Sequence, residues 1–165
     1  MIYWFTGQPS SGKTTLGHKL YKFLQTEKRN WRKSVFHLDG DDLRKLTQNK
    51  DYSDQGRQNN IRTAQTITEY LHNNDCDVVV SLVAPFISLR EEFKEKLGDD
   101  IVELYTHTTE RRERYRYRVK DYLTNDWHYI ENCPSHFIGY KYMFANKCFK
   151  TFTDMNCYIN KEKIK

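Results

Sequence analysis

Residues 7–14 of this chain read GQPSSGKT, and this stretch decides the fold. The eight residues match the pattern GxxxxGK[ST], in which glycines let a loop fold tightly around a phosphate group. Backbone N–H groups of such a loop face the anion, the lysine reaches the outer phosphate oxygens, and the last hydroxyl can bind Mg²⁺. We therefore expect a nucleotide phosphate to lie against Gly7, Ser10, Ser11, Gly12, Lys13 and Thr14.

The residues on either side of the loop supply the strand and the helix that the motif requires. Ile2–Thr6 is a short apolar, aromatic and β-branched run, which predicts a buried strand that ends at Gly7. From Thr14 to about Lys28, apolar residues recur at helical spacing and predict an amphipathic helix. We expect the Lys13 side chain to face solvent when the loop is empty.

The rest of the chain continues to alternate between strand and helix patterns. Residues 78–83 form the most continuously apolar run, which is typical of a central strand covered on both faces. The alternation predicts an α/β fold of three layers, with a mainly parallel five-stranded sheet and helices on both faces. The further predicted strands are Val35–Leu38, Val78–Val83, Ile101–Thr106 and Lys147–Thr153, and the further helices are 57–73, 87–97 and 109–122.

The composition fits one domain, residues 1–165, that acts on an anion. A chain of 165 residues and 20.0 kDa can form one core but not two ordinary ones. Basic residues exceed acidic ones by 27 − 22 = 5, which is compatible with a nucleotide substrate. A mean hydropathy of −0.89 and an N-terminus unlike a signal peptide predict a cytoplasmic protein without a membrane span. The four cysteines are scattered, which favours reduced thiols over a zinc or redox motif.

Acidic residues gather where the second predicted strand ends, in LDGDDLR at residues 38–44. Open α/β sheets place their ligands at this carboxyl edge. Asp41 could accept a proton from a substrate hydroxyl, Asp39 could help to hold hydrated Mg²⁺, and Arg44 could meet substrate charge. The alternative is that the aspartates only cap the next helix. The neighbouring phosphate loop favours the catalytic interpretation.

A third stretch, YSDQGRQNNIR at residues 52–62, places Arg57 and Asn60 on one helical face. With the two stretches above, it resembles the adenylylsulfate kinases, whose motifs read WFTGxxGSGKTT, LDGDNxR, FSxxDRxENIR and SFISPF with an arginine four residues later. This chain has WFTG at 4–7, GKTT at 12–15, LDGDDLR at 38–44, and SLVAPF at 81–86 followed by Arg90. The order and spacing match over residues 2 to about 108, and the C-terminal third diverges.

The resemblance implies a P-loop kinase that uses ATP and Mg²⁺ to phosphorylate the ribose 3′-hydroxyl of adenylyl sulfate, giving 3′-phosphoadenylyl sulfate. It implies that residues 78–83 pair directly beside residues 2–6. Its catalytic roles fall on Asp41, Asp39 and Lys13, its ATP contacts on the loop residues and Thr15, and its metal contacts on Thr14 and Asp39. Its substrate-binding roles fall on Arg44, Tyr52, Arg57, Asn60, Ser81 and Phe137, with Tyr52 and Phe137 on the two sides of the acceptor adenine.

Departures from the family pattern bear on the mechanism and on the acceptor. Ala84 replaces a serine sometimes proposed to carry a phosphate, so we expect direct in-line transfer. Gly56 and Asn59 replace acids, which removes two negative charges near the expected substrate. The family's proline-rich segment that should follow Phe137 is absent.

Residues 109–140 are expected to form a basic lid segment, as in small kinases of this fold. Arginines in such a lid can neutralise charge that develops on the transferred phosphoryl group. The resemblance favours Arg116 and Arg118 for this role, with Arg116 as a contact to ATP. Because the basic positions span every side of a helix, most of them would form a solvated cationic face. They are Arg111, Arg112, Arg114, Arg116, Arg118 and Lys120.

Two alternative functions remain open. Tyrosines interleaved with the basic residues would suit a nucleic-acid surface. The first alternative is therefore a related P-loop kinase that acts on a modified base, a strand end or another nucleotide-like molecule. A nucleotide-binding regulator without turnover is disfavoured by the presence of Lys13, Thr14, Asp39 and Asp41 together. The adenylyl sulfate kinase function predicts a small-molecule substrate and allows a homodimer. Salt dependence distinguishes it from the nucleic-acid alternative, because binding of a polyanion weakens steeply with salt and binding of a small substrate does not.

Overall fold

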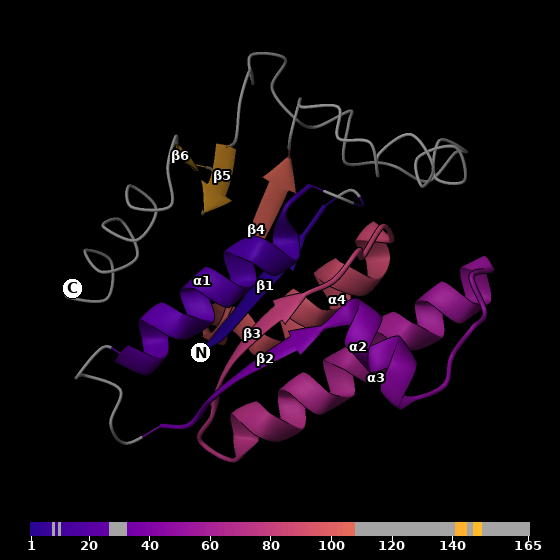
Figure 1. Cartoon of the computed structure of the whole chain (residues 1–165), viewed down its shortest axis with the longest axis horizontal. Helices are drawn as coiled ribbons and strands as arrows, with labels where there is room; N and C mark the ends of the chain where they lie inside the picture. The colour runs from indigo at the N-terminus through magenta and orange to yellow at the C-terminus, as the bar shows by residue number, and fades with distance from the viewer. Residues whose placement is uncertain (8, 10, 27–32, 108–140, 145–146, 150–165) are drawn as a thin grey trace.

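The computed structural model describes residues 1–7, 9, 11–26, 33–107, 141–144 and 147–149. Its strands form one sheet in the order β2-β3-β1-β4-β5-β6. Figure 1 shows the long parallel strands together and the two short strands beyond β4. The strands are β1 (Ile2–Thr6), β2 (Val35–Asp39), β3 (Asp77–Ser81), β4 (Ile101–His107), β5 (Lys141–Phe144) and β6 (Lys147–Phe149).

Strand β1 lies in the middle of the parallel part of the sheet. It pairs in parallel with β3, where Ile2 is opposite Val78, and with β4, where Ile2 is opposite Ile101. The predicted pairing of residues 2–6 with the run that begins at Val78 is therefore confirmed. Strands β5 and β6 pair in antiparallel fashion, so within the described residues the sheet has six strands, where five were predicted. The sequence of β5, KYMF, has no apolar alternation that would have predicted it.

Helices cover both faces of the sheet, as predicted (Figure 1). Helix α1 (Lys13–Thr26) lies on one face. Helices α2 (Gly40–Leu46), α3 (Asp54–Asn73) and α4 (Ile87–Leu97) lie on the other. The α/β architecture of three layers is thus confirmed.

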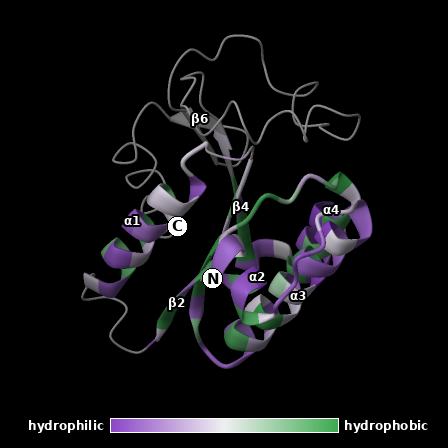
Figure 2. Ribbon diagram, turned by 45° about the vertical axis from the view of Figure 1, so that its right-hand side comes forward, coloured by the Kyte–Doolittle hydropathy of each residue, from purple (hydrophilic) through white to green (hydrophobic). Residues whose placement is uncertain are grey.

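Alternate side chains of β1 supply the two halves of the core. Tyr3 and Phe5 pack with leucines of α1, whereas Ile2 and Trp4 pack with side chains of α3 and α4. All five residues of β1 are buried, and burial of each large apolar side chain stabilises the fold by about 1.5–3 kcal/mol. Figure 2 shows hydrophobic residues in part of β4 and hydrophilic residues alternating with hydrophobic ones along α1.

The helix boundaries follow local capping. Helix α3 begins at Asp54, before the predicted start at residue 57, because the Ser53 hydroxyl accepts a hydrogen bond from the Gly56 N–H. Helix α4 ends at Leu97, and its C-cap Gly98 has a φ of +54° and opens a 3₁₀ turn, Gly98–Asp100. Helix α2 carries one buried residue, Leu43, so its sequence shows no apolar period.

Among the helices of the described residues, none is long and apolar enough to cross a membrane.

The parallel strands end at one edge of the sheet. Thr6 of β1, Asp39 of β2 and Ser81 of β3 are the last residues of their strands. The carboxyl edge of an open α/β sheet is where such folds bind ligands. The topology therefore brings the glycine loop and the acidic stretch to the same place.

Candidate active site

Two glycines with positive φ shape the phosphate loop after β1. Gly7 has a φ of +140° and Gly12 a φ of +99°, values that glycine adopts at little cost. A Cβ on Gly7 would also collide with the backbone carbonyl of Thr106 in β4. The loop therefore crosses the end of β4 at a distance that only glycine permits, and it delivers α1 to the carboxyl edge of the sheet.

Lys13 is buried, with only 7% of its surface exposed. Its Nζ donates a hydrogen bond to the carbonyl oxygen of Gly7 at 2.9 Å. Burial lowers the pKa of Lys13 to about 7, and the charges of Asp39 and Asp41 partly oppose that shift. The expectation of a solvent-facing lysine is therefore wrong, because the loop closes around the side chain and offers it a backbone oxygen.

Thr14 and Asp39 meet across the gap between α1 and β2. The Thr14 hydroxyl donates to Asp39 Oδ2 at 2.7 Å, and Asp39 Oδ1 accepts from the Asp41 backbone N–H at 2.9 Å. The second bond makes Asp39 the N-cap of α2. The capping interpretation is thus correct for Asp39, and the same carboxylate also contacts the threonine predicted to bind metal.

Asp41 lies in the first turn of α2, and its side chain is exposed. Thr15 is also exposed, in the first turn of α1. Asp41 lies near Lys13, since its negative charge raises the pKa of Lys13. The roles of Asp41 as base and of Thr15 as an ATP contact stay predictions.

Arg44 of α2 and Tyr52 of the loop between α2 and α3 form a cation–π pair. The guanidinium carbon of Arg44 lies 4.4 Å from the centre of the Tyr52 ring. Arg44 Nη1 also donates to the carbonyl oxygens of Asp51, at 2.7 Å, and Asn49, at 3.3 Å. The pair holds its own loop in shape, and Tyr52 remains 57% exposed.

Arg57 and Asn60 lie in the first turns of α3. An Nη1 of Arg57 lies 3.7 Å from a carboxylate oxygen of Asp54. Asn60 is only 4% exposed, and within the described part of the chain its Oδ1 has no hydrogen-bond partner. A buried amide oxygen without a partner is costly, so Asn60 is a good candidate to meet a donor on a ligand.

Packing against Asp51 explains why position 56 is a glycine, where the family pattern has an acid. A Cβ at this position would lie only 2.6 Å from the Cβ of Asp51. Asp51 is fixed there by the Ser53 backbone N–H, which donates to its Oδ1 at 2.8 Å. A side-chain hydrogen bond with Ser53, and then this backbone bond, lower the pKa of Asp51. A carboxylate thus remains next to position 56, although it comes from a different residue.

Ser81 does not face the open edge of the sheet. It is buried, and its hydroxyl donates to the backbone carbonyl of Lys13 at 3.2 Å. The hydroxyl proton of Ser81 is thus directed to the first residue of α1, and its substrate-binding role stays a prediction.

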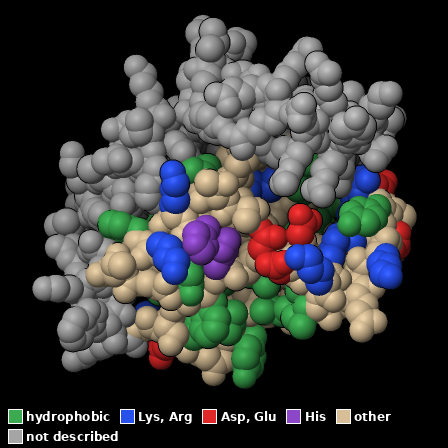
Figure 3. Space-filling view, viewed as in Figure 1, with side chains coloured by type: hydrophobic (Ala, Val, Ile, Leu, Met, Phe, Trp, Pro, Cys, Tyr) green, Lys and Arg blue, Asp and Glu red, His purple; other side chains and the backbone are tan. Residues whose placement is uncertain are grey.

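His37 is a residue that the sequence reasoning missed. Its Nε2 lies 2.9 Å from Ser81 Oγ, and its ring stacks on Tyr21 and faces His18. Burial lowers the pKa of His37, and Asp39 partly opposes that shift. Figure 3 shows histidine side chains beside a group of acidic side chains on this face. No local signal could have found this contact, because it depends on the register of β2 against β3.

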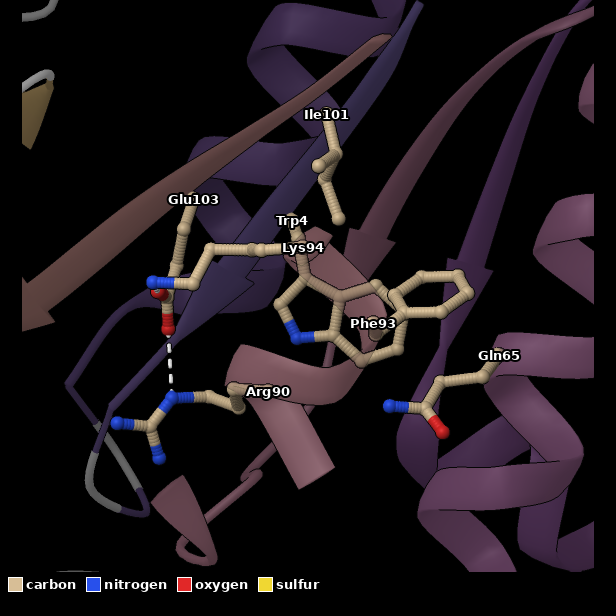
Figure 4. Close-up of a pocket in the computed structure, with 7 residues that line it drawn as sticks. All are labelled: Trp4, Gln65, Arg90, Phe93, Lys94, Ile101 and Glu103. Atoms are coloured by element: carbon tan, nitrogen blue, oxygen red, sulfur yellow. Dashed lines mark ion pairs between the residues drawn. The ribbon is translucent and has the colours of Figure 1, made fainter. Parts of the chain in front are cut away.

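Arg90 of α4 binds the backbone of the segment that follows β3. Its Nη1 donates to the carbonyl oxygen of Ala84 at 2.7 Å, and its Nε lies 2.6 Å from Glu103 Oε1 (Figure 4). Beside this ion pair is a cavity of about 10 Å³ that contains none of the predicted site residues. It is lined by Trp4, Gln65, Arg90, Phe93, Lys94, Ile101 and Glu103.

Several predicted residues lie outside the described part of the chain. They are Ser10 of the phosphate loop, Arg116 of the predicted lid and Phe137 on the expected second side of the adenine. The lid as a whole, 109–140, lies outside it as well.

The glycine loop between β1 and α1, with a buried lysine and a threonine–aspartate contact beside it, places this chain among the P-loop kinases of α/β fold. The family model described as adenylylsulphate kinase matches residues 1–121. The chain therefore belongs to the adenylylsulfate kinase family, as the sequence motifs indicated.

Curated relatives and solved structures agree with this assignment. A probable adenylyl-sulfate kinase of Synechocystis is 37% identical over 97 residues, which cover 58% of this chain and 52% of that protein. An adenylyl-sulfate kinase of Staphylococcus haemolyticus is 34% identical over 109 residues, covering 64% and 52%. The chain thus spans about half the length of the curated relatives it matches. A Mycobacterium tuberculosis APS kinase, solved in complex with AMPPNP and APS, superimposes with a TM-score of 0.60 at 25% identity, covering 73% of this chain and 70% of that one.

Proposed function

We propose that this chain is an ATP-dependent kinase that transfers the γ-phosphate to the ribose 3′-hydroxyl of adenylyl sulfate, giving 3′-phosphoadenylyl sulfate. The observation that carries the proposal is the contact of Thr14 with Asp39 beside the buried Lys13. Family membership and the names of the relatives support the choice of acceptor.

The phosphate loop supplies the ATP end of the proposed site. Backbone N–H groups of the loop would face the phosphates, and Lys13 would exchange its Gly7 carbonyl partner for phosphate oxygens. Thr15 and the lid residue Arg116 are proposed as further ATP contacts. The exchange is favourable because a phosphate offers the lysine a full negative charge in place of a neutral carbonyl.

Thr14 and Asp39 suit Mg²⁺, which prefers oxygen ligands and is commonly bound by one or two side chains together with substrate phosphates. Their two oxygen atoms already lie 2.7 Å apart. When bound there, the ion would neutralise charge that develops on the phosphate oxygens.

Asp41 is proposed as the general base of the transfer. The 3′-oxygen forms a bond to the γ-phosphorus, the bond to the bridging oxygen of ADP breaks, and the hydroxyl proton passes to the Asp41 carboxylate. The side chain of Asp41 is exposed at the carboxyl edge, where an acceptor can reach it. Because position 84 is an alanine, no phosphoserine can form there and the transfer is direct.

The loop between α2 and α3 is proposed to bind the acceptor. Tyr52, backed by Arg44, offers an exposed ring for stacking on the adenine, with Phe137 proposed for the opposite side. Arg57 and Asn60 are proposed to hold the sulfate–phosphate end, since arginine pairs well with such anions. The buried Oδ1 of Asn60 favours a donor on the ligand.

The deciding experiment offers purified protein labelled ATP and a panel of hydroxyl acceptors at two salt concentrations. We expect label in adenylyl sulfate, with a rate that changes little between low and high salt. Label in an oligonucleotide that falls steeply with salt would instead establish the nucleic-acid alternative. ATP hydrolysis without any labelled acceptor would refute both.

We also propose that residues 1–165 act as one domain with its lid at 109–140, in the cytoplasm, and as a homodimer. The scattered cysteines support a reducing compartment. Another APS kinase of the same fold, from Thiobacillus denitrificans, is described as hexameric, so assembly of this fold into oligomers has a precedent. Light scattering of the purified chain distinguishes a dimer from a monomer and from a hexamer.

A further inference from the structure

A chain of two hydrogen bonds joins β2 to the phosphate loop through β3. His37 Nε2 lies 2.9 Å from Ser81 Oγ, and Ser81 Oγ donates to the carbonyl oxygen of Lys13 at 3.2 Å. His37 is opposite Val79 in the register, and Ser81 is opposite Asp39. Since side chains alternate along a strand, His37 and Ser81 project from the same face of the sheet, toward α1.

The direction of both bonds follows from the last acceptor. A carbonyl oxygen can only accept, so the Ser81 proton points to Lys13. The Ser81 oxygen then has only its lone pairs left for His37, and His37 Nε2 must carry a proton and donate it. The neutral ring with a proton on Nε2 and the cationic ring both satisfy this condition, so the chain does not depend on the charge of His37.

Gly17 makes room for the chain of hydrogen bonds. A Cβ at this position would collide with Ser81 Oγ, and it would lie 2.8 Å from His37 Nε2 and 3.5 Å from Val79 Cγ1. Helix α1 therefore approaches the sheet closely at the turn that follows Lys13, and no side chain of α1 separates its backbone from Ser81.

From these contacts we infer that His37 is a positioning residue for the phosphate site, acting through Ser81 on the first turn of α1. The inference rests on the proposed binding of ATP at this loop. That turn carries Lys13 and Thr14, whose side chains would reach the phosphates and the metal. A donor on β2 thus fixes the helix backbone from which both side chains extend, and it does so without touching substrate.

The test uses His37→Leu, which removes the donor, and His37→Gln, whose amide can still donate near the position of Nε2. We expect His37→Leu to raise the Kd for MgATP and the KM for ATP by about three- to tenfold, the effect of one lost hydrogen bond. His37→Gln should stay within about twofold of the parent by the same measure. The KM for the acceptor should not change in either variant, a split that a general loss of stability would not produce.

Two controls assign the effect to the proposed contact. His18→Leu removes a neighbouring exposed ring of the same type, which lies 6.1 Å from His37 between ring centres, and it should leave ATP affinity unchanged. In a Ser81→Ala background, His37→Leu should have little further effect, since the two residues act in series. Equal losses with and without Ser81 would overturn the inference.

A readout without nucleotide separates this inference from the proposed function. Amide hydrogen exchange in residues 13–17 should accelerate about three- to tenfold in His37→Leu while α3 is unaffected. If the parent protein binds no ATP but this exchange still accelerates, the proposed function fails and the positioning role stands. If exchange and ATP affinity both match the parent, His37 does not position the loop.

Discussion

The phosphate end and the acceptor end of the site are built in different ways. At the phosphate end, Lys13 is buried and bound to a backbone carbonyl, and Thr14 and Ser81 tie the first turn of α1 to β2 and β3. At the acceptor end, Tyr52 is exposed, and Arg44 Nη1 donates hydrogen bonds to backbone carbonyls of the loop that follows α2. The sheet therefore fixes the phosphate end, whereas a surface loop forms the acceptor end. Substitutions at the first should change turnover, and substitutions at the second should change acceptor binding.

The largest effect is expected at Asp41, where the two ends meet. Asp41→Asn keeps the size of the side chain and removes its basicity, so kcat should fall by about 10²- to 10⁴-fold with little change in the KM for ATP. Steady-state kinetics with varied ATP and acceptor measure both values. A greater loss in Asp39→Asn, partly rescued by added Mg²⁺, would reverse the roles assigned to the two aspartates.

Lys13→Met should have the second-largest effect on turnover. It removes the positive charge that would bind the phosphates, and it keeps the volume of the side chain. We expect kcat to fall by about 10²- to 10³-fold, and ATP should no longer raise the melting temperature. The fold should remain intact, because methionine suits a buried position. Unchanged turnover in this variant would remove the phosphate loop from the mechanism.

Tyr52→Ala tests the exposed end. Loss of a stacking surface for a base should raise the KM for adenylyl sulfate by about 10- to 100-fold, while the KM for ATP should stay the same. Tyr52→Phe is the matched control, since it keeps the ring and lacks only the hydroxyl, and it should behave like the parent. A rise in the KM for ATP in Tyr52→Ala would show that the two ends are not separate.

The pH dependence of stability should distinguish the buried lysine from exposed ones. The pKa of Lys13 is about 7 in the fold and 10.5 as its ordinary value, so between these values the unfolded chain holds a proton that the folded chain has lost. The free energy of unfolding should therefore rise with pH in this window, by at most about 1.4 kcal/mol per pH unit. Denaturant titrations of the parent and Lys13→Met measure the difference, which should be flat below pH 7. A parallel course of both proteins over pH 7–9 would show that Lys13 keeps its charge in the empty loop.

The sequence predicted those parts of the fold that have a strong local pattern. Ile2–Thr6 and the run from Val78 are apolar on both faces because helices cover both, and their pairing is confirmed. Helix α2 and strand β5 were missed, because seven residues with one buried side chain and a strand of four residues are too short to show a usable period. The observed helix boundaries differ from the predicted ones where a capping residue sets the end of the helix, as Ser53 does at the start of α3.

The site was predictable in its motif residues and not in its contacts. Motif spacing indicated Lys13, Thr14 and Asp39, and the structure brings the last two into hydrogen-bond contact. Burial of Lys13 could not be predicted, because it results from the loop closing on the side chain. The role of His37 depends on strand register and on the small size of Gly17, which lies twenty residues earlier in the chain.

Gly7 and Gly98 both have a positive φ, but they should differ in how well they tolerate substitution. At Gly98 a Cβ would meet no atom of the described residues within 4 Å, and its φ of +54° is one that asparagine can also adopt. At Gly7 both the φ of +140° and the Thr106 carbonyl exclude a side chain, and the obstructing atom belongs to a strand that cannot yield. Position 98 can therefore drift, whereas every missense change at position 7 would be removed by selection, however conservative it is.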